Sequence, residues 1–144
     1  MADINQAQVT TSMEFELPSA LIVEDDEDVA QITQAMLSAL GFRSRVVPTA
    51  EQALVELVYR TPDVLLLDIF LPKMTGEDLL RVLPALEYVA KVPVIAMSAV
   101  YEPGSRLVTS VRSLGVAEFL SKPFNLADLR AALRTAGVLD AGQG

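Results

Sequence analysis

The chain contains five short segments, three of them almost wholly apolar and two of mixed character. Longer segments, in which apolar residues recur every three or four positions, separate them. A short apolar run between turn-forming residues is typical of a strand buried on both faces of a parallel sheet. The third segment shows this most clearly, because four apolar residues run directly into Asp68 and a turn with Pro72 and Gly76 follows. The pattern predicts strands at residues 20–23, 43–47, 64–67, 92–97 and 118–121.

The intervening segments carry apolar residues three or four positions apart, which is the spacing of one face of an α-helix. A helix is therefore predicted after each strand. Thr49 and Gln52 predict a capping box, Asn125 is expected to cap the last helix, and Pro84 is expected to kink or end the third. The predicted inward faces are Val29, Ile32, Met36 and Leu40; Ala53, Leu54, Leu57 and Val58; Leu79, Leu80 and Leu83; Leu107, Val108, Val111 and Leu114; and Leu126, Leu129 and Leu133.

Strands that alternate with helices in this way predict an α/β domain with a parallel sheet covered on both faces. The first, third and fourth strands are almost wholly apolar, so they belong in the centre, and the two mixed strands belong at the edges. Because crossovers are right-handed, we expect the flavodoxin-like (βα)5 fold, a doubly wound parallel five-stranded sheet of order 2-1-3-4-5. The switch point then lies between the first and third strands.

The composition fits one folded domain. The chain has 144 residues and an apolar fraction of 51%, which is enough for a core. No apolar run approaches the roughly 18 residues of a membrane span, and the polar N-terminus is unlike a signal peptide. We expect a cytoplasmic protein with a domain at residues 20–137 and tails at residues 1–19 and 138–144. The alternating residues 13–17 leave a short extra strand open as an alternative.

Charge and missing residue types exclude several classes of function. A formal net charge of −8 predicts no direct binding of nucleic acid. The sequence contains neither cysteine nor histidine, so disulfides, thiolate chemistry and histidine catalysis are excluded.

Polar residues follow four of the predicted strands and should meet at one edge of the sheet. Glu24 and Asp25 follow the first strand, Asp68 the third, Ser98 the fourth and Lys122 the fifth. Taken singly, Asp68 could merely open a loop, Ser98 could be a turn hydroxyl and Lys122 a solvated surface charge. Because the carboxyl ends of parallel strands share an edge, and ligands of open α/β sheets bind there, the five residues together predict a site.

The carboxylates limit the chemistry of that site. Two like charges about 4 Å apart repel by about 4 kcal/mol at an effective dielectric constant near 20, so the cluster must take up protons or hold a cation. Oxygen ligands favour a hard cation, and Mg²⁺ suits a site that shares carboxylates with a phosphate. Lys122 and the Ser98 hydroxyl could each hold a phosphoryl oxygen, with Asp68 as acceptor. The sequence therefore predicts an aspartyl-phosphate site, and any phosphohistidine donor must belong to a partner.

Several motifs resemble the receiver domain of two-component response regulators over about residues 20–136. They are Leu21-Ile22-Val23-Glu24-Asp25-Asp26, Leu66-Leu67-Asp68 with Pro72 and Gly76, Met97-Ser98-Ala99 and Lys122-Pro123-Phe124. The resemblance implies that Asp68 is the phosphoacceptor and Lys122 the phosphate-sensing lysine. It implies a Mg²⁺ site formed by Glu24, Asp25, Asp68 and the backbone carbonyl of Phe70. It also implies that Ser98 and Phe119 form a switch, and that the bond from Lys122 to Pro123 is cis.

By the same resemblance, the expected phosphoryl donor is a sensor histidine kinase or a histidine phosphotransfer protein. The chain would be a stand-alone receiver, a phosphoacceptor rather than an enzyme, that signals to an unknown downstream protein by binding or phosphorelay. Phosphorylation is expected to turn Phe119 inward and to alter the face of the fourth helix, fifth strand and fifth helix near Tyr101, Arg106 and Arg112. The protein is expected to be a monomer or a dimer through that face.

Two other functions are weighed against this one. The alternative is a degenerate receiver that acts as a constitutive protein-interaction module, which the intact Asp68 and Lys122 disfavour. A phosphatase of the Asp-x-Asp kind is also disfavoured, because Phe70 stands where the second acid of such enzymes would be.

Overall fold

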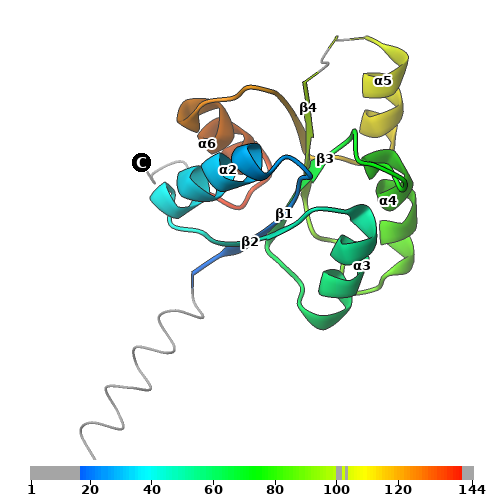
Figure 1. Cartoon of the computed structure of the whole chain (residues 1–144), viewed down its shortest axis with the longest axis horizontal. Helices are drawn as coiled ribbons and strands as arrows, with labels where there is room; N and C mark the ends of the chain where they lie inside the picture. Colours follow the sequence, from blue (N-terminus) through cyan, green and yellow to red (C-terminus); the bar gives the residue numbers. More distant parts are fainter. Residues whose placement is uncertain (1–16, 100–101, 103, 141–144) are drawn as a thin grey trace, which may run out of the picture.

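The structure is a computed structural model that describes residues 17–99, 102 and 104–140, and its centre is a parallel sheet. The strand order is β2-β1-β3-β4-β5, which confirms the predicted topology (Figure 1). The two mixed strands form the edges, and the three apolar strands lie between them. The strands are β1 Ser19–Val23, β2 Arg43–Val47, β3 Val64–Asp68, β4 Val94–Ser98 and β5 Glu118–Ser121.

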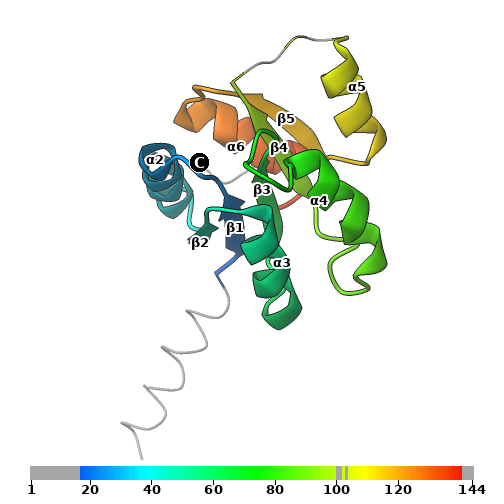
Figure 2. The same cartoon turned by 45° about the vertical axis from the view of Figure 1, so that its right-hand side comes forward.

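Helices cover both faces of the sheet, as a doubly wound fold requires. Figures 1 and 2 show α3, α4 and α5 on one side of the strands and α2 and α6 on the other. Alternate strand residues enter the two layers, so that Leu65 and Leu67 pack in one core cluster and Val64 and Leu66 in the other. The helices are α2 Glu27–Ala39, α3 Ala50–Tyr59, α4 Gly76–Val82, α5 Arg106–Ser113 and α6 Leu126–Thr135, with a 3-10 helix η1 Leu83–Ala85 after α4.

A polar side chain caps the start of each of these α-helices by accepting a hydrogen bond from a first-turn N–H. Each cap satisfies a group that a helix start leaves unpaired and contributes about 1 kcal/mol. The expected cap at Asn125 is present, and Thr49 accepts from Gln52 as one half of the expected capping box. The expected effect of Pro84 is confirmed, because the α-helix stops at Val82 and the proline lies in η1. The caps are Asp26, Thr49, Thr75, Ser105 and Asn125.

The predicted inward faces of the first two helices are partly wrong. In α2 the buried side chains are Ala30, Thr33 and Leu37, whereas Ile32 is 57% exposed. In α3, Val58 is 72% exposed. The small residues of α2 face the sheet because they allow close packing, and the Thr33 hydroxyl is satisfied by donating to a backbone carbonyl one turn earlier. Hydrophobic periodicity gives little weight to such small or polar residues, so it selected the neighbouring stripe.

The limits of the folded elements differ slightly from those predicted. β1 begins at Ser19, one residue before the predicted 20–137 range, and Leu139, two residues after it, is buried in the core. β4 begins at Val94, and Pro93 lies just before it. The extra strand considered for residues 13–17 falls mainly on residues outside the described part of the chain. Among the described residues, no helix combines the length and the apolar composition that a membrane span needs.

Gly76 brings the start of α4 against the end of β3. A Cβ atom at this position would lie 2.5 Å from the carbonyl oxygen of Asp68 and 2.8 Å from the Cα of Ile69, both of them backbone atoms. The Gly76 N–H also donates to the Ile69 carbonyl oxygen at 3.1 Å. The missing side chain therefore lets α4 fix the loop that follows Asp68.

We predict that Gly76→Ala lowers the free energy of unfolding by about 2 kcal/mol, the usual scale of overpacking. Helix propensity alone predicts the opposite sign, since alanine stabilises a helix by up to about 1 kcal/mol relative to glycine. Urea unfolding measures the difference, with Ala127→Gly on the exposed first turn of α6 as the control for propensity. A Gly76→Ala variant as stable as the wild type, or more stable, would show that the close approach does not constrain the loop.

Candidate functional site

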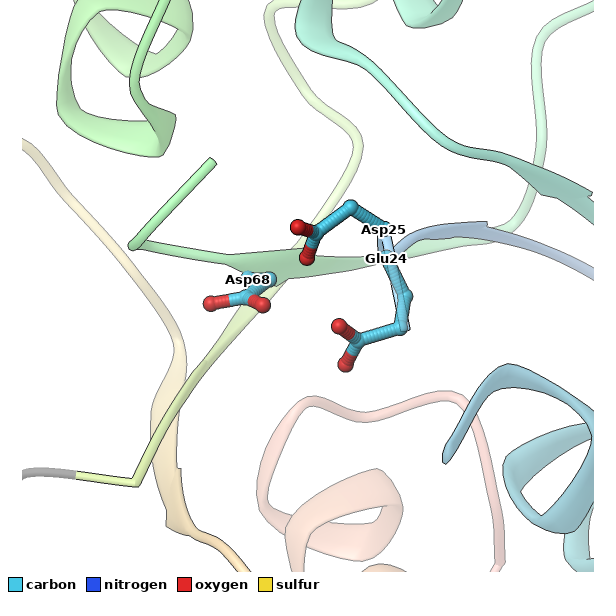
Figure 3. Close-up of side chains that lie close together, drawn as sticks. All are labelled: Glu24, Asp25 and Asp68. Carbon is cyan, nitrogen blue, oxygen red and sulfur yellow. The ribbon is translucent and has the colours of Figure 1, made fainter. Parts of the chain in front are cut away.

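Three carboxylates meet at the carboxyl edge of the sheet, where β1 and β3 end (Figure 3). Glu24 and Asp25 directly follow β1, and Asp68 is the last residue of β3. One carboxylate oxygen from each residue lies within 4.8 Å of the other two. Glu24 and Asp68 are buried, and Asp25 is exposed. The structure thus brings together the three acidic residues that the sequence places after these strands.

The register of the sheet explains this convergence. β1 and β3 are neighbours, and Val23 pairs with Leu67, so the residues after this pair, Glu24 and Asp68, stand side by side. The Glu24 N–H donates to the carbonyl oxygen of the last β2 residue at 3.0 Å, which extends the β1–β2 ladder by one residue. The Asp26 N–H donates to the Glu24 carboxylate at 3.2 Å, and the Asp26 side chain then caps α2. The strand-to-helix turn therefore holds Glu24 in place from both sides.

Lys122 lies between two of the carboxylates. Its Nζ donates to Oδ2 of Asp68 at 2.9 Å and also to the carboxylate of Glu24. Its backbone N–H donates to the carbonyl oxygen of Ser98 at 2.8 Å, which joins the end of β5 to the end of β4. The peptide bond from Lys122 to Pro123 is cis, as the resemblance implies. Four strands of the sheet therefore contribute to one site.

Burial and ion pairing shift the pKa values of this group. Burial raises the pKa of Glu24 from 4.5 to about 7, because loss of water disfavours the carboxylate more than the hydrogen bond from Lys122 favours it. Burial also acts to lower the pKa of Lys122, but its hydrogen bonds to Glu24 and Asp68 outweigh this effect and the pKa is raised. Lys122 therefore stays charged at neutral pH, where Glu24 exchanges its proton.

The donor set fits a hard divalent cation. All three acidic residues offer carboxylate oxygens, the ligands that Mg²⁺ prefers, and these oxygens are close enough to share one ion. The Phe70 N–H donates to Oδ1 of Asp68 at 2.9 Å, so the loop after β3 turns back over the acidic cluster. The Phe70 side chain points away from the core and is 53% exposed. A role for its carbonyl oxygen as a metal ligand stays a prediction.

Ser98 and Phe119, the expected switch residues, are both buried. Ser98 ends β4 next to the strand of Asp68 and has no exposed surface. Phe119 lies on β5, is 7% exposed and packs in the core layer beneath α3, α4 and α5. Its ring is thus already inside, which differs from the expectation that phosphorylation turns it inward. Tyr101, named for the same surface, lies outside the described residues.

An apolar groove lies beside the acidic cluster and was not predicted from the sequence. It has a volume of about 490 Å³, and the acidic residues and Lys122 close one end of it. The exposed side chain of Ile32 lies in its wall, although periodicity had placed this residue in the core. The sequence of α2 carries two neighbouring apolar stripes. A helix that packs against one face of a sheet can bury only one of them, so the other stays exposed. The apolar wall consists of Val29, Ile32, Met36, Pro123 and Phe124.

The sequence is similar to known signalling proteins. The profile of the response regulator receiver domain matches residues 20–134. The KDP operon transcriptional regulatory protein KdpE of Escherichia coli K12 is 32% identical over 120 residues, which cover 83% of this chain and 51% of that protein. The sensory transduction protein RegX3 of Mycobacterium tuberculosis H37Rv is 34% identical over 125 residues, covering 84% of this chain and 53% of that protein. The chain thus spans about half the length of the curated relatives it matches.

Solved structures share the fold. A sensor protein from Polaromonas sp. JS666 has a TM-score of 0.76 at 32% identity, covering 83% of this chain and 94% of that one. The receiver domain of the sensor histidine kinase PA1611 from Pseudomonas aeruginosa PAO1, solved with a magnesium ion in its active site cleft, has a TM-score of 0.74 at 32% identity, covering 83% and 98%. The sequence profile, the relatives and the sheet topology agree, and this chain belongs to the response regulator receiver domain family of two-component systems.

Proposed function

We propose that this chain is a phosphorylation-controlled receiver in which Asp68 accepts a phosphoryl group from a phosphohistidine of a partner protein. The observation that carries the proposal is the position of Asp68. Its carboxylate is buried at the end of a central strand, 2.9 Å from Lys122 Nζ and beside Glu24 and Asp25. A buried carboxylate in contact with a cation and with further acidic groups suits a phosphoryl acceptor that needs a metal.

The transfer itself requires little of the protein beyond position. A carboxylate oxygen of Asp68 attacks the phosphorus and forms a P–O bond, while the P–N bond to the donor histidine breaks and the imidazole keeps the electron pair and takes up a proton. Mg²⁺ held by Glu24, Asp25, Asp68 and the Phe70 carbonyl would offset the charge of the phosphoryl oxygens. Lys122 and the Ser98 hydroxyl would each bind one of these oxygens. The chain would act as a phosphoacceptor that catalyses only its own phosphorylation and dephosphorylation.

The apolar groove supplies a docking surface for the donor, a sensor histidine kinase or a histidine phosphotransfer protein. It opens directly beside Asp68, so a protein seated on α2 would bring a phosphohistidine to the carboxylate. Ile32 is 57% exposed in its wall, so covering it would contribute about half of the roughly 1.5 to 3 kcal/mol that full burial of such a side chain supplies. The partner would therefore present an apolar surface around its histidine.

The output would lie on α5, β5 and α6. Phosphorylation adds about −1.5 to −2 charge, which would draw the Ser98 hydroxyl toward the phosphate. α5 is joined to α4 because the Ser110 hydroxyl donates to Glu77 at 2.6 Å, and this hydrogen bond lowers the pKa of Glu77. Since α4 begins at Gly76, against Asp68, this contact offers a route from the site to α5. A downstream protein or a second copy would bind there, while Phe119 stays inside.

The alternative function, a constitutive interaction module, would use the same surfaces without phosphate. The ion pair between Asp68 and Lys122 favours a phosphorylated receiver over a constitutive module, because a module without phosphoryl chemistry has no need of a buried acidic cluster. The cytoplasmic location stays a prediction.

We predict that Asp68→Asn abolishes phosphorylation and preserves the fold, because the amide is nearly isosteric with the carboxylate but cannot form an acyl phosphate. Intact-mass spectrometry after treatment with acetyl phosphate and Mg²⁺ should show one added phosphate on the wild type and none on the variant. Asp63→Asn, at the opposite end of β3, is the matched control and should be labelled like the wild type. A phosphorylated Asp68→Asn protein, or a wild type that takes up no phosphate, would contradict the proposal.

We predict that the metal-free protein loses stability between pH 4.5 and about 7 because of Glu24. In this window the folded state holds more protons on Glu24 than the unfolded state does, so the free energy of unfolding falls as the pH rises. The rise in the pKa of Glu24 from 4.5 to about 7 corresponds to a loss of at most about 3 kcal/mol in the free energy of unfolding. Lys122 does not contribute to this slope, because it stays protonated throughout the window.

Urea unfolding at pH 5 and pH 8 measures this effect. The difference between the two pH values should shrink in Glu24→Gln, and it should also shrink in the wild type with Mg²⁺, which binds the ionised carboxylates. Glu87→Gln, an exposed carboxylate far from the cluster, is the control. Equal pH dependence in the wild type and Glu24→Gln would show that Glu24 is not held in the protonated form.

We predict that Ile32→Glu slows phosphotransfer from a protein donor about tenfold, which corresponds to about 1.4 kcal/mol of lost docking energy. The donor is the sensor kinase of the same organism that phosphorylates the wild type fastest. Labelling by acetyl phosphate should be unchanged, since a small donor needs no groove. Val58→Glu, which changes a more exposed apolar residue on α3, controls for added charge. Equal slowing by Val58→Glu, or none by Ile32→Glu, would place the donor elsewhere.

A further inference from the structure

The outer side of α3 carries an exposed apolar surface. Val55, Val58 and Tyr59 are 59%, 72% and 80% exposed, and their spacing of three and four residues places them on one face of the helix. The opposite face, with Ala53 and Leu57, is buried in the core. Of the eight large apolar side chains that are exposed in the described part of the chain, three therefore lie on one helix of 10 residues. We call Val55, Val58 and Tyr59 the α3 stripe.

Neither helix formation nor core packing accounts for the α3 stripe. Valine is a weaker helix former than alanine, glutamate or lysine, because its branched side chain loses rotamer freedom against the preceding turn. Contiguous exposed apolar residues mark an interaction surface, whereas single exposed ones do not. Figures 1 and 2 show α3 on the side of the sheet opposite α2 and α6, so the stripe lies away from the apolar groove along α2. Covering the stripe therefore requires a contact separate from the one that covers the groove.

Opposite charges stand at the two ends of the α3 stripe. Glu51 lies in the first turn of α3, and Arg60 directly follows the last residue of the helix. Both residues are exposed, and neither side chain makes a hydrogen bond or an ion pair with a described residue. Along the helix the surface is thus acidic, then apolar, then basic. An antiparallel copy of the same helix presents these features in the reverse order, so the surface is complementary to itself.

A twofold axis beside Val55 would bring the opposite charges together. Glu51 lies four residues before Val55 and Arg60 five residues after it, which is roughly 6 Å and 7.5 Å along a helix axis. In an antiparallel pair, Glu51 of each copy therefore faces Arg60 of the other, and the same surface serves both copies. Val55 lies next to its own counterpart. For helix axes about 8 to 10 Å apart, the two Val55 Cα atoms approach to roughly 3.5 to 5.5 Å.

We propose that the α3 stripe is the contact surface of a symmetric dimer, in which α3 of one copy packs antiparallel against α3 of a second copy. A contact between two helices of 10 residues belongs to the small class of interfaces, below about 1,200 Å², so the dimer is weak and reversible. The contact leaves the groove beside Asp68 uncovered, because that groove is lined by α2 and by the ends of the strands. The dimer therefore forms whether or not Asp68 carries a phosphoryl group.

Because the sequence contains no cysteine, single cysteines can test this arrangement in the full chain. Val55→Cys should form a disulfide-linked dimer under mild oxidation, since a residue beside the twofold axis meets its own counterpart at the Cα separation of a disulfide, about 4.4 to 6.8 Å. Ile32→Cys is the matched control, because Ile32 is 57% exposed and lies on α2, outside the stripe. It should cross-link at least about tenfold more slowly. Equal rates in the two variants would reflect random collision and would overturn the proposal.

Sedimentation equilibrium measures the same dimer without a cross-link. Glu51→Arg and Arg60→Glu, each made alone, set like charges opposite each other at both ends of the contact and should raise the dissociation constant about tenfold. The two substitutions combined should restore the dimer, because both ion pairs then form with their signs exchanged.

Treatment with acetyl phosphate and Mg²⁺ should leave the dissociation constant of the wild type unchanged. A wild type that stays monomeric at every concentration, or a combined variant as weak as the single ones, would overturn the proposal. A dimer that forms only after phosphorylation would also overturn it and would assign self-association to the face of α5, β5 and α6.

Discussion

Charge repulsion among Glu24, Asp25 and Asp68 is the constraint on which the site depends. Three carboxylates with oxygens within 4.8 Å of one another repel strongly, and two of them are buried. Lys122 offsets this repulsion by donating to Glu24 and Asp68, and burial raises the pKa of Glu24 so that a proton is taken up near neutrality. A cluster whose carboxylates need a cation and a proton to offset their charge is well suited to bind a metal ion and a phosphoryl group.

The sheet holds these mutually repelling carboxylates in place. The register of β1 against β3 sets Glu24 beside Asp68, and the end of β5 is joined to the end of β4 through Lys122 and Ser98. Gly76 lets α4 approach the Asp68 backbone more closely than any other residue would allow. The acidic cluster lies at the carboxyl ends of β1 and β3, and the groove that Arg43, Arg45 and Arg60 help to line lies at the opposite end of the sheet.

Much of the fold and the acidic cluster followed from the sequence, because strand ends in a parallel sheet are fixed by topology. The mixed strands identified the edges, and the order of the strands brought Glu24, Asp25, Asp68 and Lys122 together. The buried face of α2 did not follow, since Ala30 and Thr33 carry little hydrophobic signal and Ile32 carries much. For the same reason the apolar groove was missed, because its wall is the apolar stripe that periodicity assigned to the core.

The proposed phosphoryl acceptor, Asp68, can be identified directly by chemical reduction. Borohydride reduces an acyl phosphate to an alcohol, so wild-type protein treated with acetyl phosphate and Mg²⁺, reduced and digested can be mapped by peptide mass spectrometry. We expect the reduced residue to be Asp68, in the peptide that contains Phe70, and expect it to disappear when Mg²⁺ is removed by a chelator. Reduction at Asp25, at another carboxylate, or at no residue would contradict it.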